Sequence, residues 1–154
     1  MSTTFDRAAR EQYLADLHVG VLTVALGGEE AGGTLALPIW YDYSPAAGVS
    51  IITSRASGKG AAIEAAGRFG LVAQTEAIPY QYVSVEGPVV EVRQCELEHD
   101  LLPMAVRYFG HELGRRYADG WAATGADDHV FVMRPEHWRT ADFTADFAEL
   151  TPRV

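Results

Sequence analysis

The sequence is short of lysine, and this shortage bears on the partners that the protein can bind. Lys59 is the only lysine among 12 basic residues, and the formal net charge at pH 7 is −9. Proteins that bind nucleic acids depend on many lysine and arginine contacts to phosphate groups. We therefore expect no nucleic-acid partner, although one small basic pocket is compatible with this charge.

Cysteine is equally scarce, since Cys95 stands alone. A single cysteine excludes a disulfide framework and a thiolate metal cluster, which fits a protein of the reducing cytoplasm. Glu96 follows Cys95, and no base that would activate the thiol is evident. We interpret Cys95 as an ordinary half-buried thiol and not as a nucleophile.

Long apolar segments are also missing from the sequence. No apolar run approaches the roughly 18 residues that a membrane-spanning helix needs. The N-terminal segment lacks the apolar centre of a signal peptide. We expect a cytoplasmic protein that does not enter a membrane. The length of 154 residues fits a single domain over residues 1–154.

Several motifs with a known chemistry fail at a decisive position. The glycines around Lys59 lack the following Ser or Thr of a P-loop, and Ile63 stands where a dinucleotide-binding motif needs glycine. The segment HELGR at 111–115 begins like a zinc-protease motif but ends in arginine, and the five histidines show no other metal-ligand spacing. A Gly-x-Ser-x-Gly elbow is absent. We therefore predict no metal site and assign no catalytic residue.

Hydrophobic periodicity predicts short strands separated by turns, with three helices among them. The predicted strands cover residues 20–26, 34–43, 49–53, 68–76, 80–93 and 129–143. The predicted helices cover about 5–17, 57–66 and about 98–118, the first capped by Ser2, Thr3 or Thr4 and the second followed by Gly67. Gly87 and Pro88 predict a bulge or an edge in the long strand. A doubly wound parallel sheet would need helices between nearly all strands, so we predict a mainly β fold, a small antiparallel barrel with added helices.

The turn after strand 49–53 surrounds the only lysine with polar groups. Its polar and charged residues are Thr53, Ser54, Arg55, Ser57 and Lys59. A helix N-terminus offers free backbone N–H groups, hydroxyls add donors, and basic side chains neutralise an anion. Glycines on both sides of Lys59 allow the backbone to approach a ligand closely. Two interpretations stay open here: a site for a phosphate monoester, or a helix capped by Ser57 with two solvated charges nearby.

The turn resembles the phosphate-binding turn of the pyridoxamine 5'-phosphate oxidase-like family of FMN-binding split β-barrels. Thr53, Ser57 and Lys59 keep the order and spacing of the family's threonine, serine and lysine. Gly58 stands where the family often has arginine, and Arg55 is a candidate replacement for that charge. The resemblance covers residues 8–95 through three segments that are similar to the family's first helix and strands: LADLHVGVLTVAL, LALPIWYDYSPAAGVSIITSR and YQYVSVEGPVVEVR.

This resemblance implies a six-stranded antiparallel barrel of the Greek-key type that forms a homodimer, with cofactors in the grooves between subunits. The backbone of strand 36–40 would run along the flavin ring. The family's strand that matches 80–93 often begins with a glutamine that reaches the flavin, and its counterpart here is either Gln81 or Tyr82. The implied cofactor-binding residues are Pro38, Ile39, Trp40, Thr53, Ser54, Arg55, Ser57, Lys59, Gln81 and Tyr82.

The implied function is that of an oxidoreductase that transfers hydride to or from a small organic substrate, with the cofactor carrying the redox chemistry. FMN is the first candidate cofactor, and the deazaflavin coenzyme F-420 is the alternative. The anionic tail of F-420 would need further basic residues, for which Arg7, Arg10 and Arg68 are candidates. True pyridoxamine phosphate oxidation is not expected, because Arg153 is the only basic residue of segment 141–154.

Two other interpretations remain open. The first is a non-catalytic barrel that binds a flavin, haem or another planar ligand. The second is an unrelated small barrel with a structural role, in which Arg55 and Lys59 are solvated charges. Turnover would separate the non-catalytic barrel from an enzyme. Cofactor affinity would separate the enzyme and the non-catalytic barrel from the structural barrel.

Overall fold

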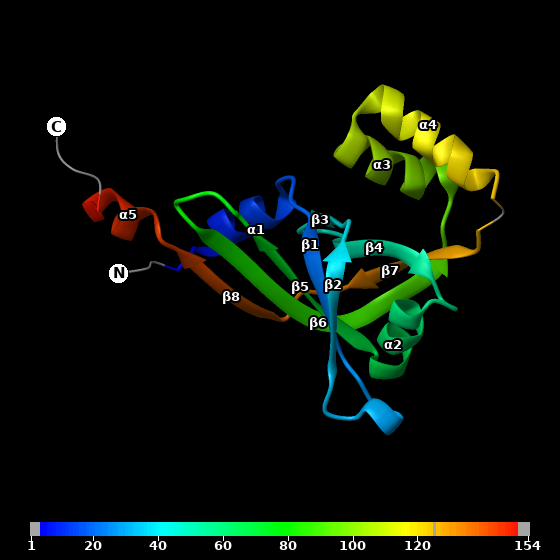
Figure 1. Ribbon diagram of the computed structural model, residues 1–154, viewed down its shortest axis with the longest axis horizontal. Helices are drawn as coiled ribbons and strands as arrows, with labels where there is room; N and C mark the ends of the chain where they lie inside the picture. The colour runs from blue at the N-terminus through cyan, green and yellow to red at the C-terminus, as the bar shows by residue number, and fades with distance from the viewer. Residues whose placement is uncertain (1–3, 125, 151–154) are drawn as a thin grey trace.

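The computed structural model describes residues 4–124 and 126–150 (Figure 1). These residues form one antiparallel sheet of eight strands, accompanied by five α-helices. The strands are β1 (Gly20–Ala25), β2 (Thr34–Ile39), β3 (Asp42–Ser44), β4 (Gly48–Ser54), β5 (Arg68–Gln74), β6 (Gln81–Gln94), β7 (Asp128–Met133) and β8 (His137–Asp142). The helices are α1 (Arg7–Ala15), α2 (Gly58–Ala66), α3 (Leu102–Phe109), α4 (His111–Ala122) and α5 (Thr144–Leu150). The predicted mainly β fold with added helices is confirmed.

The long strand β6 organises the sheet. Its first half pairs with β5 on one side and with β8 on the other, and its second half pairs with β7. The strand order is β2–β1–β5–β6–β7–β4–β3, with β8 beside β6. Within the described residues β2 and β3 do not pair with each other, so the sheet is not closed. The expected count of six strands is too low, because two of the predicted strands are each divided.

The first division falls at Trp40 and Tyr41, inside the predicted strand 34–43. There the chain passes from β2, which pairs with β1, to β3, which pairs with β4. Tyr41 is fully buried, and its hydroxyl donates to the carbonyl oxygen of Leu14 at 2.8 Å. Local apolar character predicts a continuous strand here, but the change of partner strand interrupts it.

The second division falls within the predicted strand 129–143, and Gly87 explains it. The backbone N–H groups of Arg134 and Glu136 donate to β6 on either side of Gly87, at 3.0 Å and 2.9 Å. A Cβ atom at Gly87 would collide with the carbonyl oxygen of Arg134. Only glycine permits this approach of the turn between β7 and β8. The predicted bulge lies just beyond this point, where the register with β7 shifts between Val89 and Glu91.

The predicted helix 98–118 is a helical hairpin. Gly110 has a φ of +78° and separates α3 from α4, and a single turn of π-helix at Leu97–Leu101 leads into α3. One amphipathic stripe runs through both helices, which is why periodicity alone does not reveal the break. The hairpin stands apart from most of the sheet, beyond β4 and β7 (Figure 1).

The N-terminal helix is shorter than the predicted span 5–17. The carboxylate of Asp6 caps it by accepting a hydrogen bond from the N–H of Ala9 at 2.8 Å. Thr4 is therefore not the cap, and Ser2 and Thr3 lie outside the described residues. Each helix in the described part of the chain is too short or too polar to cross a bilayer.

Candidate functional site

The turn between β4 and α2 is tied together by its own hydroxyl groups. Ser57 is the N-cap of α2: its Oγ accepts from the N–H of Gly60 at 3.1 Å and donates to the carbonyl oxygen of Ser54 at 2.7 Å. The buried hydroxyl of Thr53 lies 3.1 Å from the same Oγ. The predicted cap is confirmed. The Ser57 hydroxyl already donates its proton to the carbonyl oxygen of Ser54, so it has no donor left for an anion. The backbone N–H groups of the turn are the donors that an anion could use.

The backbone at the start of α2 has the features of an anion site. Gly58 and Lys59 are its first two residues, and no described residue accepts from their backbone N–H groups. Free N–H groups at the positive end of a helix dipole favour an anion. Gly60 allows the turn to close against the helix, because a Cβ atom there would collide with the carbonyl oxygen of Ser54.

The two basic side chains of the turn differ in their surroundings. Arg55 forms an ion pair with Glu64 of α2, with 2.6 Å between Nε and Oε1. Among the described residues Lys59 has no carboxylate within ion-pair distance; burial raises the pKa of Asp128 of β7, and the charge of Lys59 partly opposes that rise. Lys59 is therefore the cation of this turn that is available to an anion.

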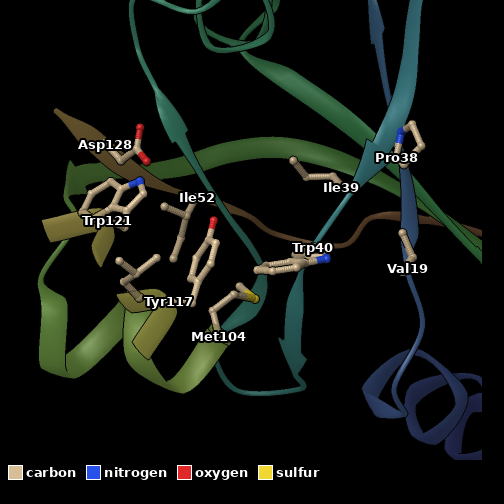
Figure 2. Close-up of a pocket in the computed structure, with 10 residues that line it drawn as sticks. Val19, Pro38, Ile39, Trp40, Ile52, Met104, Tyr117, Trp121 and Asp128 are labelled. Atoms are coloured by element: carbon tan, nitrogen blue, oxygen red, sulfur yellow. The ribbon is translucent and has the colours of Figure 1, made fainter. Parts of the chain in front are cut away.

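Figure 2 shows a pocket of about 280 Å³. Two of its lining residues connect it to this turn: Ile52 precedes the turn in β4, and Asp128 pairs with Ser54. The lining residues come from the position before β1, from β2 and the residue after it, from β4 and β7, and from the helical hairpin with the π-helical turn that leads into it. They are Val19, Pro38, Ile39, Trp40, Ile52, Leu101, Met104, Tyr117, Trp121 and Asp128. All are apolar or aromatic except Asp128. Such a lining suits a planar organic ligand that is oriented by a few polar contacts.

Trp40 is held in place by the hairpin. Its ring stacks on that of Tyr108, with 4.9 Å between ring centroids and 7° between ring planes. Phe109 meets Trp40 edge-on at 4.8 Å, and Tyr117 meets it at 5.6 Å. The orientation of the indole in the pocket wall is therefore fixed by α3 and α4, which fold around it.

Asp128 is the one charged residue of the pocket lining. It is the first residue of β7 and pairs with Ser54, the last residue of β4. Burial raises the pKa of its carboxyl, and the charges of Lys59 and His129 oppose that rise. The indole of Trp121 lies beside the carboxyl (Figure 2). Asp128 therefore links the turn that contains Lys59 to the pocket.

The structure brings together most of the predicted cofactor-binding residues. Pro38, Ile39 and Trp40 line the pocket, and the turn from Thr53 to Lys59 adjoins it through the pairing of Ser54 with Asp128. Gln81 and Tyr82 lie elsewhere, at the start of β6, where they pair with Asp142 and Ala141 of β8. Within one chain these two residues do not line the pocket.

Other lining residues escaped the sequence analysis. Asp128 was not among the predicted site residues, because no motif surrounds it in the sequence. Only the pairing of β4 with β7 brings it to the pocket. Tyr117 and Trp121 are four residues apart, which places them on one face of α4. That spacing in the sequence indicates that the two aromatic side chains share one face of a helix and can contribute to one pocket. Cys95 lies away from the pocket lining, and burial raises the pKa of its thiol to about 11, which is consistent with an unreactive thiol.

Comparison with known proteins supplies the fold type. Neither a known protein-family model nor a curated protein sequence matches the chain. An F420 reductase superposes with a TM-score of 0.65 at 18% identity, over 84% of this chain and 94% of that chain. A provisionally assigned pyridoxamine 5'-phosphate oxidase from Listeria innocua superposes with a TM-score of 0.51 at 15% identity, over 86% and 92%. The haem storage protein HutZ of Vibrio cholerae superposes with a TM-score of 0.57 at 12% identity, over 86% and 89%.

The chain has the split-barrel fold of these proteins. The resemblance of the sequence to pyridoxamine 5'-phosphate oxidase-like proteins is thus confirmed at the level of fold. In this split barrel, β6 is the strand shared by the two parts of the sheet. The pocket lies at the end of β4, between the barrel and its helical hairpin.

Proposed function

We propose that this split barrel binds a flavin-type cofactor and uses it to transfer hydride to or from a small organic molecule. The observation that carries the proposal is the position of an anion site next to an apolar, aromatic pocket. The free N–H groups of Gly58 and Lys59 belong to the turn that follows Ile52 and pairs with Asp128. Ile52 and Asp128 line a pocket together with Pro38, Ile39 and Trp40. A planar ring that carries a phosphate group matches this arrangement, because its phosphate would occupy the anion site and its ring the apolar pocket.

Each part of the site has a definite task in this proposal. The start of α2 and the ammonium group of Lys59 bind the phosphate, and Ser57 with Thr53 keeps the turn in the conformation that exposes those N–H groups. Trp40 and Ile39 provide the apolar wall for the ring, and the hairpin excludes water from it. When bound, the cofactor supplies the hydride chemistry.

FMN is the cofactor that we place first, and coenzyme F-420 is the alternative. Both compounds consist of a planar ring and a linker that carries a phosphate. An F420 reductase shares the fold of this chain. The net charge of −9 favours the shorter and less anionic of the two. Parallel titrations with both compounds separate them.

The second candidate function is binding without catalysis. HutZ, a haem storage protein, shares the fold, and the pocket lining contains no histidine and no acid–base pair. Turnover separates the two functions: a bound flavin that a chemical reductant reduces, but that no organic acceptor reoxidises faster than free flavin, favours storage or carriage.

We further propose that two copies of the chain associate and cover the open side of the pocket. Val19 lines the pocket and yet is 56% exposed, and Leu17, Val90 and Val92 are further exposed apolar side chains. Light scattering at micromolar concentration tests this association, and a monomer over the whole concentration range would contradict it.

The first experiment is a fluorescence titration of FMN and of F-420 into the protein and into Lys59→Ala. Loss of one charge-assisted phosphate contact costs about 1.5–3 kcal/mol, so the affinity should fall by at least about tenfold. Arg139→Ala is the matched control, since it removes one positive charge from an exposed position on β8. Equal affinity of the wild type and Lys59→Ala, or no binding of either compound, would refute the proposed phosphate site.

A further inference from the structure

The pocket has a polar group at one end that the proposed binding of ring and phosphate does not yet use. Figure 2 shows Asp128 and Trp121 at one end of the pocket and Pro38 and Val19 at the other, with Trp40 between them. Asp128 faces the end that adjoins the turn of Lys59, because it pairs with Ser54. Asp128 therefore lies on the side of the pocket nearest α2, where the linker of a ligand with its phosphate at α2 and its ring at Trp40 would be placed.

The chemistry of this position is specific. Asp128 contributes a hydrogen-bond acceptor to a lining that is otherwise apolar or aromatic. An ionised carboxylate accepts hydrogen bonds and donates none, so it selects for hydroxyl or N–H groups and against carbonyl or phosphate oxygens. The indole N–H of Trp121 donates to this carboxyl, which has further acceptor positions for a ligand. Lys59 of α2, and Asp127 and His129 on either side in the chain, are the charged groups that act on it.

We propose that Asp128 is a specificity-determining residue that accepts hydrogen bonds from a hydroxylated linker between the phosphate and the ring of the bound cofactor. This inference rests on the proposed function and adds a third contact to it. The site would then recognise three parts of one molecule in sequence. Lys59 and the start of α2 bind the phosphate, Asp128 binds the polyol, and Trp40 with its neighbours binds the ring.

Three flavins that differ by one part each test this assignment. Lumiflavin has the ring alone, riboflavin adds the polyol, and FMN adds the phosphate. Each is titrated into the wild type, Asp128→Ala and Lys59→Ala, with flavin fluorescence as the readout. Asp127→Ala is the matched control for Asp128→Ala, because it removes the neighbouring carboxylate from a side chain that is 76% exposed and absent from the pocket lining.

The proposal predicts a distinct pattern of losses. Asp128→Ala should weaken riboflavin about tenfold and change lumiflavin less than about twofold, since only riboflavin has the hydroxyl groups. Lys59→Ala should weaken FMN and leave riboflavin unchanged. With FMN the loss in Asp128→Ala should be smaller than with riboflavin, because removal of the carboxylate also removes its repulsion of the phosphate.

Each alternative outcome is decisive. Equal changes for riboflavin and lumiflavin in Asp128→Ala, or the same losses in Asp127→Ala, would overturn the role of Asp128 while leaving flavin binding intact. No binding of any of the three flavins by the wild type would instead overturn the proposed function itself. If Asp128→Ala does not fold, Asp128→Leu keeps the volume of the side chain without a hydrogen-bond acceptor, and the same comparison of riboflavin with lumiflavin applies.

Discussion

The hydroxyl group of Tyr108 donates a hydrogen bond to the carbonyl oxygen of His18 at 2.6 Å and accepts one from the backbone N–H of Tyr41 at 3.1 Å. A single side chain of the hairpin thus joins two connections of the barrel, and the ring of the same tyrosine stacks on Trp40. The hairpin is anchored to the barrel at the wall of the pocket.

We expect Tyr108→Phe to destabilise the protein by about 1–3 kcal/mol, because it leaves two partly buried backbone groups without a partner. The stacking on Trp40 should survive, so the tryptophan emission should change little. Urea unfolding followed by circular dichroism measures the loss. Tyr117→Phe is the control, since that ring also packs on Trp40 but is 40% exposed. Equal midpoints for the two variants would show that the Tyr108 hydroxyl does not anchor the hairpin.

Gly58 and Gly60, at the start of α2, should respond differently to alanine. Gly60→Ala places a Cβ atom against the carbonyl oxygen of Ser54, a backbone atom that cannot rotate away, and should cost about 1–3 kcal/mol. Gly58→Ala meets nothing within 4 Å and should be neutral or stabilising by up to about 1 kcal/mol, as expected for alanine in a helix. Thermal unfolding of the pair checks this. If both variants unfold at the same temperature, the close approach of Gly60 to β4 is not required.

An acid-sensitive ion pair fixes the entrance to the hairpin. Arg93 at the end of β6 donates two hydrogen bonds of 2.6 Å to the carboxylate of Asp100, which also accepts from the N–H of Glu96 at 2.9 Å. Arg93 lowers the pKa of Asp100 below its ordinary value of 3.8. Because the folded pKa is the lower one, this stabilisation is fully present above the ordinary value and is lost as the pH falls through the folded pKa.

Asp100→Asn should therefore lower the free energy of unfolding at pH 7 by on the order of 1–2 kcal/mol. The difference from the wild type should shrink as the pH falls below 3.8 and vanish once the pH is below the lowered pKa of Asp100. Glu91→Gln is the control, because Glu91 also pairs with Arg93, at 3.3 Å, but is half exposed. A difference that persists unchanged at pH 3 would contradict the assignment.

Asp128 should show the opposite dependence on pH. Burial raises the pKa of its carboxyl above the ordinary value of 3.8, so the folded state binds the proton more tightly than the unfolded state and stability falls as the pH rises through this range. Asp128→Asn should be at least as stable as the wild type at pH 7, and the two should converge as the pH falls to about 4. Melting temperatures at a series of pH values measure this, with Asp127→Asn as control. A lower melting temperature of Asp128→Asn at pH 7 would mean that the carboxylate stabilises the fold.

The local parts of the structure were predictable from the sequence, and the long-range parts were not. Ser57 and Gly67 mark the ends of α2 by their chemistry alone, since one caps the first turn and the other takes the left-handed conformation with a φ of +66°. The interruption at Trp40 depends on which strands pair on either side of it, and apolar periodicity does not encode partners. Asp128 reaches the pocket only through its pairing with Ser54, residues that are far apart in the chain.

The close approach at Gly87 has a consequence for how this chain tolerates insertions. Because β6 continues through Gly87 while its neighbour changes from β8 to β7, one strand sets the register of both parts of the sheet. An added residue before Gly87 would turn Val83 and Val85 out of the core, and one after Glu91 would shift the partner of His129. The bulge between Val89 and Glu91 is the point of β6 where one residue is already unpaired. We therefore expect this strand to tolerate a change of length at that bulge better than elsewhere along it.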